Sequence, residues 1–198
     1  MISYAKTILS IIGVSLLAGC AASGPAISTP VRTGAAVAAP AYQNGDQWTY
    51  QIIRSTGDNE QIRISYRDGK FEHDNPTIYN GAIWAIVYRT DGDLQPLTFP
   101  LTPGKSWSYR YQATDPTGRK SWRDAEVKVI GPTAQPIKTP AGQFKTVEIQ
   151  RFESWGRAQR TSTYFYSPDT KSVVKLVSDN LSNKQHYEME LIKHSPGR

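Results

Sequence analysis

Cysteine and histidine are scarce in this sequence. Its 198 residues include one cysteine, Cys20, and three histidines, His73, His186 and His194. A single cysteine cannot form a disulfide within the chain, and a domain of about 150 residues needs none, because it can bury roughly 70% of its unfolded surface. The histidines are too widely spaced for a zinc site of the usual kind. We therefore expect a domain that folds without disulfides and holds no metal and no cofactor.

Familiar catalytic motifs are lacking as well. The sequence contains no G-x-S-x-G nucleophile motif. Gly104-Lys105-Ser106 is similar to the end of a phosphate-binding loop, but Phe99 stands where that loop needs its first glycine. We therefore predict that the protein is not an enzyme. The alternative is an envelope hydrolase with a dispersed polar site, which would require His73 or His186 in a cleft beside a carboxylate.

Four polar residues near the C-terminus lie an even number of positions apart: His186, Glu188, Glu190 and His194. On a regular strand they would project from one face. At about 3.3 Å per residue the two histidines would lie about 26 Å apart, so they could not bind one ion together. His186 and Glu188 could form half of a metal or acid–base site, but a solvent-exposed strand face explains the same pattern and is the interpretation we favour.

The longest apolar run lies at the N-terminus. Lys6 precedes Thr7–Leu17, which is apolar over most of its length. A helix needs about 20 apolar residues to span a membrane, so this run is too short to do so. A positive residue followed by a short apolar run is typical of a secretory signal peptide. We predict that residues 1–19 are a signal peptide.

The end of that run resembles the lipobox of bacterial lipoproteins, Leu17-Ala18-Gly19-Cys20. The resemblance implies that the sulfur of Cys20 receives a diacylglycerol, and that cleavage makes Cys20 the acylated N-terminus and the membrane anchor. Several acyl chains hold a protein on a membrane better than one, because each buried methylene adds about 0.8 kcal/mol. Ala21, where an inner-membrane lipoprotein often has Asp, implies the outer membrane, with the domain facing the periplasm.

The segment after Cys20 is rich in Ala, Pro, Ser and Gly. Pro25, Pro30 and Pro40 oppose helix formation, and residues 20–41 offer no large apolar face to bury. We predict a disordered tether over residues 20–41 and a single β-domain over residues 42–198.

From Tyr42 onward, apolar and polar residues alternate with a period of two. Half-buried strands are therefore expected around 48–52, 62–66, 107–111, 127–129, 147–149 and 187–191. Ile83–Tyr88 and Val173–Val177 are apolar on both faces, which is typical of central strands. Asp68-Gly69, Gly131-Pro132 and Ser167-Pro168-Asp169 are turn sequences. The pattern predicts an all-β antiparallel protein of about ten strands, a curved sheet, half-barrel or sandwich.

Aromatic residues are abundant, and several adjoin basic ones. Aromatic rings beside arginine can bind sugars, anionic lipid headgroups or peptidoglycan fragments. A core role is the alternative, and we favour it for Trp48, Trp84 and Trp107. The candidate ligand-binding residues are Trp122, Arg123, Trp155, Tyr109 and Tyr111. The expected partner is an envelope glycan, lipid or protein, and nucleic acid is not expected for an exported protein.

Three segments together resemble a group of bacterial envelope β-proteins of unsettled function, many of them lipoproteins. They begin at Phe99-Pro100-Leu101, Pro140-Ala141-Gly142 and Tyr164-Phe165-Tyr166. The similarity covers roughly residues 45–193. It implies a curved antiparallel sheet like the half-barrels of periplasmic lipoprotein carriers, and it raises a second hypothesis, a carrier that cups an acyl or other apolar ligand. Fold alone does not fix function.

Overall fold

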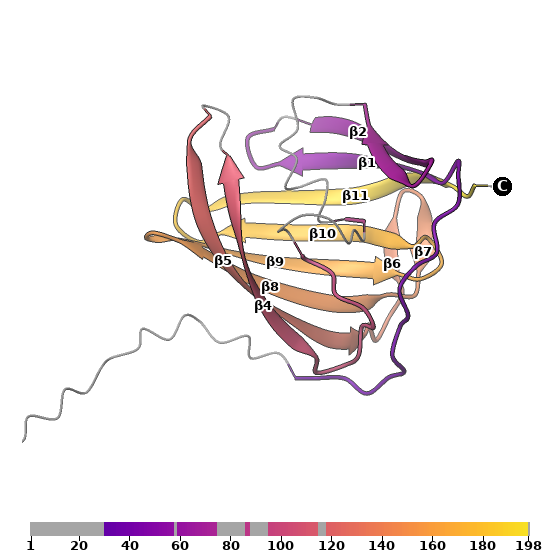
Figure 1. The fold of residues 1–198 in the computed structure, drawn as a ribbon, viewed down its shortest axis with the longest axis horizontal. Coiled ribbons are helices and arrows are strands. Elements are labelled where there is room, and N and C mark those ends of the chain that lie inside the picture. The colour runs from indigo at the N-terminus through magenta and orange to yellow at the C-terminus, as the bar shows by residue number, and fades with distance from the viewer. Residues whose placement is uncertain (1–29, 58, 75–85, 88–94, 115–117, 198) are drawn as a thin grey trace, which may run out of the picture.

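The fold is an open, curved antiparallel sheet, as a computed structural model of the chain shows (Figure 1). The structure describes residues 30–57, 59–74, 86–87, 95–114 and 118–197. Nine strands form one sheet in the order β3-β2-β1-β11-β10-β9-β8-β5-β4, and β6 and β7 form a separate hairpin. The all-β prediction is confirmed. Within the described residues, no helix is long and apolar enough to cross a membrane.

The strands follow the alternating segments of the sequence closely. Their bounds are β1 Gln47–Arg54, β2 Asn59–Arg67, β3 Lys70–His73, β4 Ser106–Thr114, β5 Lys120–Pro132, β6 Ile137–Thr139, β7 Gly142–Phe144, β8 Val147–Trp155, β9 Ala158–Ser167, β10 Ser172–Asn180 and β11 Gln185–Ser195. Asp68 and Gly69 join β2 to β3 with φ of 51° and 79°, the left-handed backbone that a tight two-residue hairpin turn needs. Ser167-Pro168-Asp169 begins the β9–β10 turn, as predicted.

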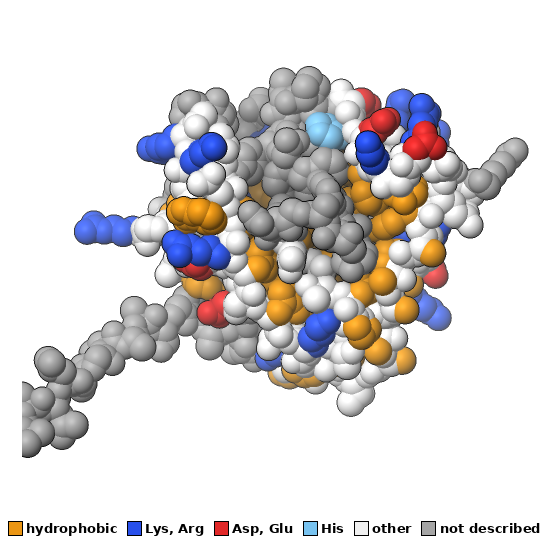
Figure 2. All heavy atoms as spheres, viewed as in Figure 1, with side chains coloured by type: hydrophobic (Ala, Val, Ile, Leu, Met, Phe, Trp, Pro, Cys, Tyr) orange, Lys and Arg blue, Asp and Glu red, His pale blue; other side chains and the backbone are white. Residues whose placement is uncertain are grey.

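The core lies on the inner, concave face of the sheet. In Figure 1, β4 and β5 rise steeply across one end of β8–β11, so the sheet curls around its own apolar side chains. The largest of these are fully buried: Trp48, Tyr50, Tyr164 and Tyr166. Figure 2 shows apolar side chains across the lower middle and the right of this view, with most lysines and arginines toward its periphery.

One of the two predicted central strands is confirmed. β10, which contains Val173–Val177, is the fifth of nine strands and is buried along most of its length. Of Ile83–Tyr88, only Ile86 and Val87 are described. The carbonyl of Ile86 accepts a hydrogen bond from the Val173 amide at 2.9 Å, and Val87 forms a single antiparallel bridge with Ser172. The rest of that segment and Trp84 lie outside the described residues.

The predicted turn at Gly131-Pro132 is wrong. β5 runs on through Pro132, and its register against β8 shifts between Val129 and Gly131. Gly131 has φ of 120°, and a Cβ there would come within 2.7 Å of the Arg32 carbonyl oxygen. Glycine is therefore used here for a bulge and for close contact with the N-terminal segment.

The described part of the predicted tether lies against the domain. The Arg32 amide donates to the Ile130 carbonyl at 2.7 Å, and its guanidinium pairs with Glu148 at 2.7 Å. Val37 and Leu101 exchange two backbone hydrogen bonds of 3.0 and 2.8 Å. The expectation of a disordered tether therefore does not hold at Arg32 and Val37, whose backbone groups form hydrogen bonds with the domain. Residues 1–29, including the lipobox and Cys20, lie outside the described part of the chain.

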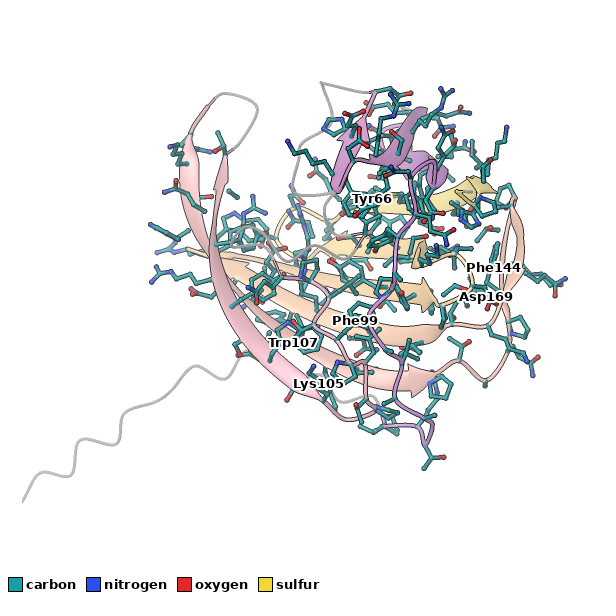
Figure 3. The ribbon with its side chains drawn as sticks, turned by 45° about the vertical axis from the view of Figure 1, so that its right-hand side comes forward. Tyr66, Phe99, Lys105, Trp107, Phe144 and Asp169 are labelled. Carbon is teal, nitrogen blue, oxygen red and sulfur yellow. The ribbon has the colours of Figure 1, made fainter. Side chains whose placement is uncertain are left out.

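The first of the three resembling segments closes one side of the core. Figure 3 shows Phe99, Lys105 and Trp107 near one another at the start of β4. The Lys105 ammonium donates to the carbonyls of Thr98 and Pro100 at 2.7 and 3.1 Å and lies 5.6 Å from the Trp107 ring centroid. Phe99 packs edge-on against Tyr166 at 5.2 Å. These residues are structural, as their turn-forming sequence predicted.

Candidate functional site

The inner face of the sheet divides into an apolar half and a polar half. Strand register defines one continuous apolar row across six strands, formed by Val129, Ile149, Tyr164, Leu176, Met189 and Ile52. Two residues further along β8, the inward positions become Arg151 and Glu153. Arg151 pairs with Ser162 on β9, and Glu153 with Arg160. The chain thus places charge at positions where the strand pattern calls for core residues.

Glu153 is the centre of this polar half. It is fully buried. Its Oε2 lies 3.2 Å from Arg151 Nη2, its Oε1 lies 3.5 Å from Arg123 Nη1, and the Tyr111 hydroxyl donates to Oε1. Burial acts to raise the pKa of Glu153, but the charge of Arg151 and the Tyr111 hydrogen bond outweigh it, so the pKa is lowered. Glu153 is therefore ionised at neutral pH.

Arg151 is the most buried of the arginines that the structure describes and is 5% exposed. Its Nη1 donates to the Tyr109 hydroxyl at 3.2 Å, and its guanidinium lies 5.4 Å from the Tyr164 ring centroid. Burial acts to lower the pKa of Arg151, but the attractions around it, of which that of the Glu153 carboxylate is the strongest, together outweigh burial and raise the pKa. Among the described residues, Arg151 Nε and the Tyr164 hydroxyl have no hydrogen-bond partner.

Two further arginines lie on either side of Trp155 at the end of β8. The Arg123 guanidinium lies 4.3 Å from the Trp155 ring centroid, and the Arg160 guanidinium lies 5.4 Å from it. Arg123 is 13% exposed, so this cation–π contact is largely shielded from water. The Nε atoms of Arg123 and Arg160 also lack a partner among the described residues. We call Arg123, Arg151, Arg160 and Glu153 the arginine cluster.

Tyrosines surround the arginine cluster and keep their protons. Burial is the main cause that raises the pKa of Tyr109, Tyr111 and Tyr164. For Tyr111, the adjacent Glu153 carboxylate raises the pKa further. These hydroxyls therefore act as hydrogen-bond donors and acceptors, and not as bases, at neutral pH.

Four of the five candidate binding residues come together here. Arg123 belongs to the arginine cluster, and Tyr109, Tyr111 and Trp155 contact it. Trp122 does not: it lies on the outer face of β5 and is 52% exposed. The strand alternation explains the split, since Trp122 and Arg123 are consecutive and point to opposite faces.

Three residues of the cluster were not predicted from the sequence: Arg151, Glu153 and Arg160. Their position in the alternating pattern of the strand was the available signal. Arg151 and Glu153 continue the inward series that begins with Val147 and Ile149. Charged side chains at core parity need a partner in the fold, and that requirement could have identified them.

The histidines do not gather in a site. His186 lies on the outer face, where its Nδ1 is 2.7 Å from Asp179 and its Nε2 is 3.3 Å from Glu188. His194 does not share that face as expected, because the β1–β11 register shifts between Thr49 and Tyr50. Its ring stacks on Trp48 at 5.9 Å. Within the described residues, no group of three His, Cys, Asp or Glu could hold a metal ion.

Comparisons with known proteins inform the fold. No protein-family model and no curated protein matches the sequence. A protein from Parabacteroides distasonis that is provisionally assigned as a lipoprotein superposes with a TM-score of 0.50 at 12% identity, covering 82% of this chain and 100% of that one. The hypothetical lipoprotein YmcC from Escherichia coli gives 0.46 at 11% identity, covering 76% and 85%. The chain therefore shares the fold of the Parabacteroides protein.

A third similar structure is an exported protein with a YmcC-like fold, assigned provisionally, from Bacteroides fragilis. It gives a TM-score of 0.38 at 12% identity, covering 81% of this chain and 100% of that one.

The chemistry available to the arginine cluster is anion recognition. Among the described residues, this cluster holds three arginines and a single carboxylate, that of Glu153. Two of them, Arg123 and Arg160, are only partly buried. An excess of guanidinium groups with unpartnered N–H donors suits a phosphate or carboxylate group, because arginine donates to such groups through a planar fork.

Proposed function

We propose that the protein is a lipoprotein of the bacterial envelope, anchored through Cys20, whose β-domain binds an anionic group without catalysing a reaction. The domain would face the periplasm from the outer membrane. The observation that carries the binding proposal is the excess of arginine over carboxylate around Trp155, at the end of the inner face.

Two observations support the anchor. The lipobox resemblance at Leu17-Ala18-Gly19-Cys20 comes from the sequence. The Parabacteroides protein that shares the fold is itself provisionally assigned as a lipoprotein. The described domain begins to pack by Arg32, so about a dozen residues would separate it from the membrane. At no more than about 3.6 Å per residue, that tether would keep the domain within about 45 Å of the anchor.

The pKa directions in the cluster support binding over catalysis. The pKa of Glu153 is lowered, and those of Tyr109, Tyr111 and Arg151 are raised. A general acid or base works best when its pKa lies near the operating pH, and each of these groups is moved away from neutrality. The cluster is therefore suited to holding a charge in place.

Packing favours an anionic ligand over the purely apolar cargo of a carrier. The apolar half of the inner face is filled by large side chains such as Trp48 and Tyr164, both fully buried. Leu97 and Leu101, from the segment before β4, are buried in the same core. The partly exposed groups at the polar end are instead Arg123, Arg160 and Trp155.

Calorimetry tests the binding proposal. The mature acylated protein, purified in a nonionic detergent, should bind inorganic phosphate or acetate. Arg123→Gln should weaken that binding about tenfold, because a hydrogen bond to a charged group contributes about 1.5–3 kcal/mol. Arg110→Gln is the matched control, since Arg110 lies on the outer face of the adjacent strand. Failure of the wild type to bind either anion, or equal weakening by both variants, would contradict the proposal.

Palmitate labelling tests the anchor separately. Cells grown with [³H]palmitate should label the wild type and not Cys20→Ser, and the variant should lose its membrane fractionation. Its β-domain should still fold, since Cys20 precedes every described strand. A wild-type protein that never acquires label would overturn the anchor and leave the binding proposal standing.

A further inference from the structure

The outer face of the sheet carries a second polar surface that the arginine cluster does not explain. A hollow of about 340 Å³ lies over β4, β5 and β8. Its outward-facing lining residues are Ser108, Arg110, Asp124, Glu126, Phe152 and Ser154. We call it the outer trough. Its volume falls within the range of about 300–1,000 Å³ that is common for small-ligand sites.

An exposed tryptophan flanks the outer trough. Trp122 is 52% exposed, and its strand position is two residues from Asp124 on the same face. The Arg110 guanidinium lies 5.3 Å from the Trp122 ring centroid and 3.4 Å from Asp124 Oδ1. The three side chains thus form a continuous aromatic, basic and acidic surface. Large aromatic rings are normally buried, so such exposure on a rigid strand favours a contact role.

The strand register fixes the polar groups around this ring. Arg110 pairs across the sheet with Asp124, and Asp124 pairs with Ser154. Ser108 pairs with Glu126, which in turn pairs with Phe152. Polar side chains therefore lie side by side at the spacing of neighbouring strands, about 4.8 Å. Phe152 is 8% exposed and provides an apolar floor beside them.

The charge of the outer trough differs from that of the arginine cluster. Two carboxylates, Asp124 and Glu126, face a single guanidinium, Arg110. An anionic headgroup seated on these lining residues would meet an excess of one carboxylate. Both Arg110 and Asp124 are more than 60% exposed, so their ion pair is weak and each side chain can turn to a ligand.

We propose that the outer trough binds a neutral glycan. The exposed face of Trp122 would stack on the C–H face of a sugar ring, because an indole offers a large rigid apolar surface. The carboxylates of Asp124 and Glu126 would accept hydrogen bonds from sugar hydroxyls, and Arg110 would donate to them. The hydroxyls of Ser108 and Ser154 can do both. The assignment is independent of the arginine cluster, which faces the opposite side of the sheet.

Binding to neutral oligosaccharides tests the proposal. The mature acylated protein in nonionic detergent is titrated with hexasaccharides of β1,4-linked glucose, α1,4-linked glucose and β1,4-linked N-acetylglucosamine, and with hexalysine. At least one hexasaccharide should bind. Trp122→Ala should weaken it at least tenfold, whereas Trp122→Phe should stay within about threefold of the wild type. Asp124→Asn should weaken it severalfold.

The control variant is Ile53→Ala, which alters another exposed apolar side chain of the outer face, on β1. It should leave glycan binding unchanged. Three results would overturn the proposal: no hexasaccharide binds, Trp122→Ala binds as well as the wild type, or hexalysine alone binds and thereby identifies a cationic peptide surface. Circular dichroism of each variant checks that the sheet is retained.

Discussion

Three neighbouring strands, β4, β5 and β8, carry two arginine–tryptophan pairs, one on each face of the sheet. On the inner face, Arg123 lies 4.3 Å from the Trp155 ring centroid and is 13% exposed. On the outer face, Arg110 lies 5.3 Å from the Trp122 ring centroid and is 63% exposed. Both contacts join a guanidinium to an indole ring, but the two arginines differ in their exposure to water. The comparison therefore isolates what burial does to a cation beside an aromatic ring.

Burial makes the inner pair dependent on its neighbours. An arginine removed from water needs a counter-charge, and Glu153 supplies it to Arg123 and to Arg151. The outer arginine also faces a carboxylate, Asp124, but water and salt screen that attraction. The inner pair is thus part of a network whose members rely on one another, whereas the outer pair can be altered locally.

The largest expected effect is the loss of the inner counter-charge. Glu153→Gln would leave Arg151 buried without a carboxylate, and removing one partner of a buried ion pair typically destabilises a protein by about 3–5 kcal/mol. Chemical denaturation followed by tryptophan fluorescence should show this loss. The matched outer variant, Asp124→Asn, should change stability by less than about 1 kcal/mol. Equal effects from the two variants would mean that Arg151 is solvated.

Acid should weaken the inner network next. The folded protein holds the pKa of Glu153 below its ordinary value of 4.5, because Arg151 and Tyr111 outweigh burial. Stability from this carboxylate is therefore fully present above pH 4.5 and is lost as the pH falls through the lower folded pKa. Melting temperatures measured from pH 7 to pH 3 should fall in the wild type and fall less steeply in Glu153→Gln.

The control for the acid experiment is Arg110→Gln, which should keep the wild-type pH profile. Asp46 contributes to the profile of every variant. Burial acts to raise its pKa, but hydrogen bonds from the Gly197 and Gln43 amides and the Lys171 ammonium lower it overall. The informative quantity is therefore the difference between variants. Parallel curves for the wild type and Glu153→Gln would show that Glu153 has the same pKa in the folded and unfolded states, which would contradict the lowered pKa.

The sequence predicts some features of the two faces of the sheet and not others. Period-two alternation puts Trp122 and Arg123 on opposite faces of the sheet, and the run Val173–Val177, apolar on both faces, correctly predicts β10 as a central strand. It cannot say that Arg123, from β5, meets Glu153, from β8, because that contact requires the order of the strands in the sheet. Pairing between distant strands is a property of topology, which local pattern does not encode.

Irregularities in the strands account for the remaining errors. His194 turns to the inner face because the β1–β11 register shifts, and Gly131 lies in a bulge where a turn was expected. A shift of one residue moves every later side chain to the other face, so parity arguments fail beyond it. The packing of Arg32 on Ile130 was missed for a different reason: its segment has a disordered composition and is held mainly through backbone bonds and one ion pair.

The coupling energies of the two cation–π contacts should also differ, by a smaller amount. A double-mutant cycle with Arg123→Gln and Trp155→Leu should give a coupling energy of about 1–2 kcal/mol, since desolvation strengthens a cation–π contact. The cycle with Arg110→Gln and Trp122→Leu should give about 0.5 kcal/mol or less. Urea denaturation of the four variants in each cycle provides the values. If the outer pair couples as strongly as the inner one, burial does not distinguish the two pairs.

The smallest effect is the salt dependence of the outer pair. The screening length falls from about 10 Å at 0.1 M salt to about 3 Å at 1 M. The Arg110–Asp124 ion pair, at 3.4 Å between exposed groups, should therefore contribute less at high salt. Its coupling energy, from a double-mutant cycle with Arg110→Gln and Asp124→Asn, should fall from a few tenths of a kcal/mol toward zero in 1 M NaCl. The Arg151–Glu153 coupling, measured in the same way, should persist, because ions do not enter a buried site. Loss of both couplings in salt would show that the inner network is open to solvent, and would remove the physical distinction between the two faces of the sheet.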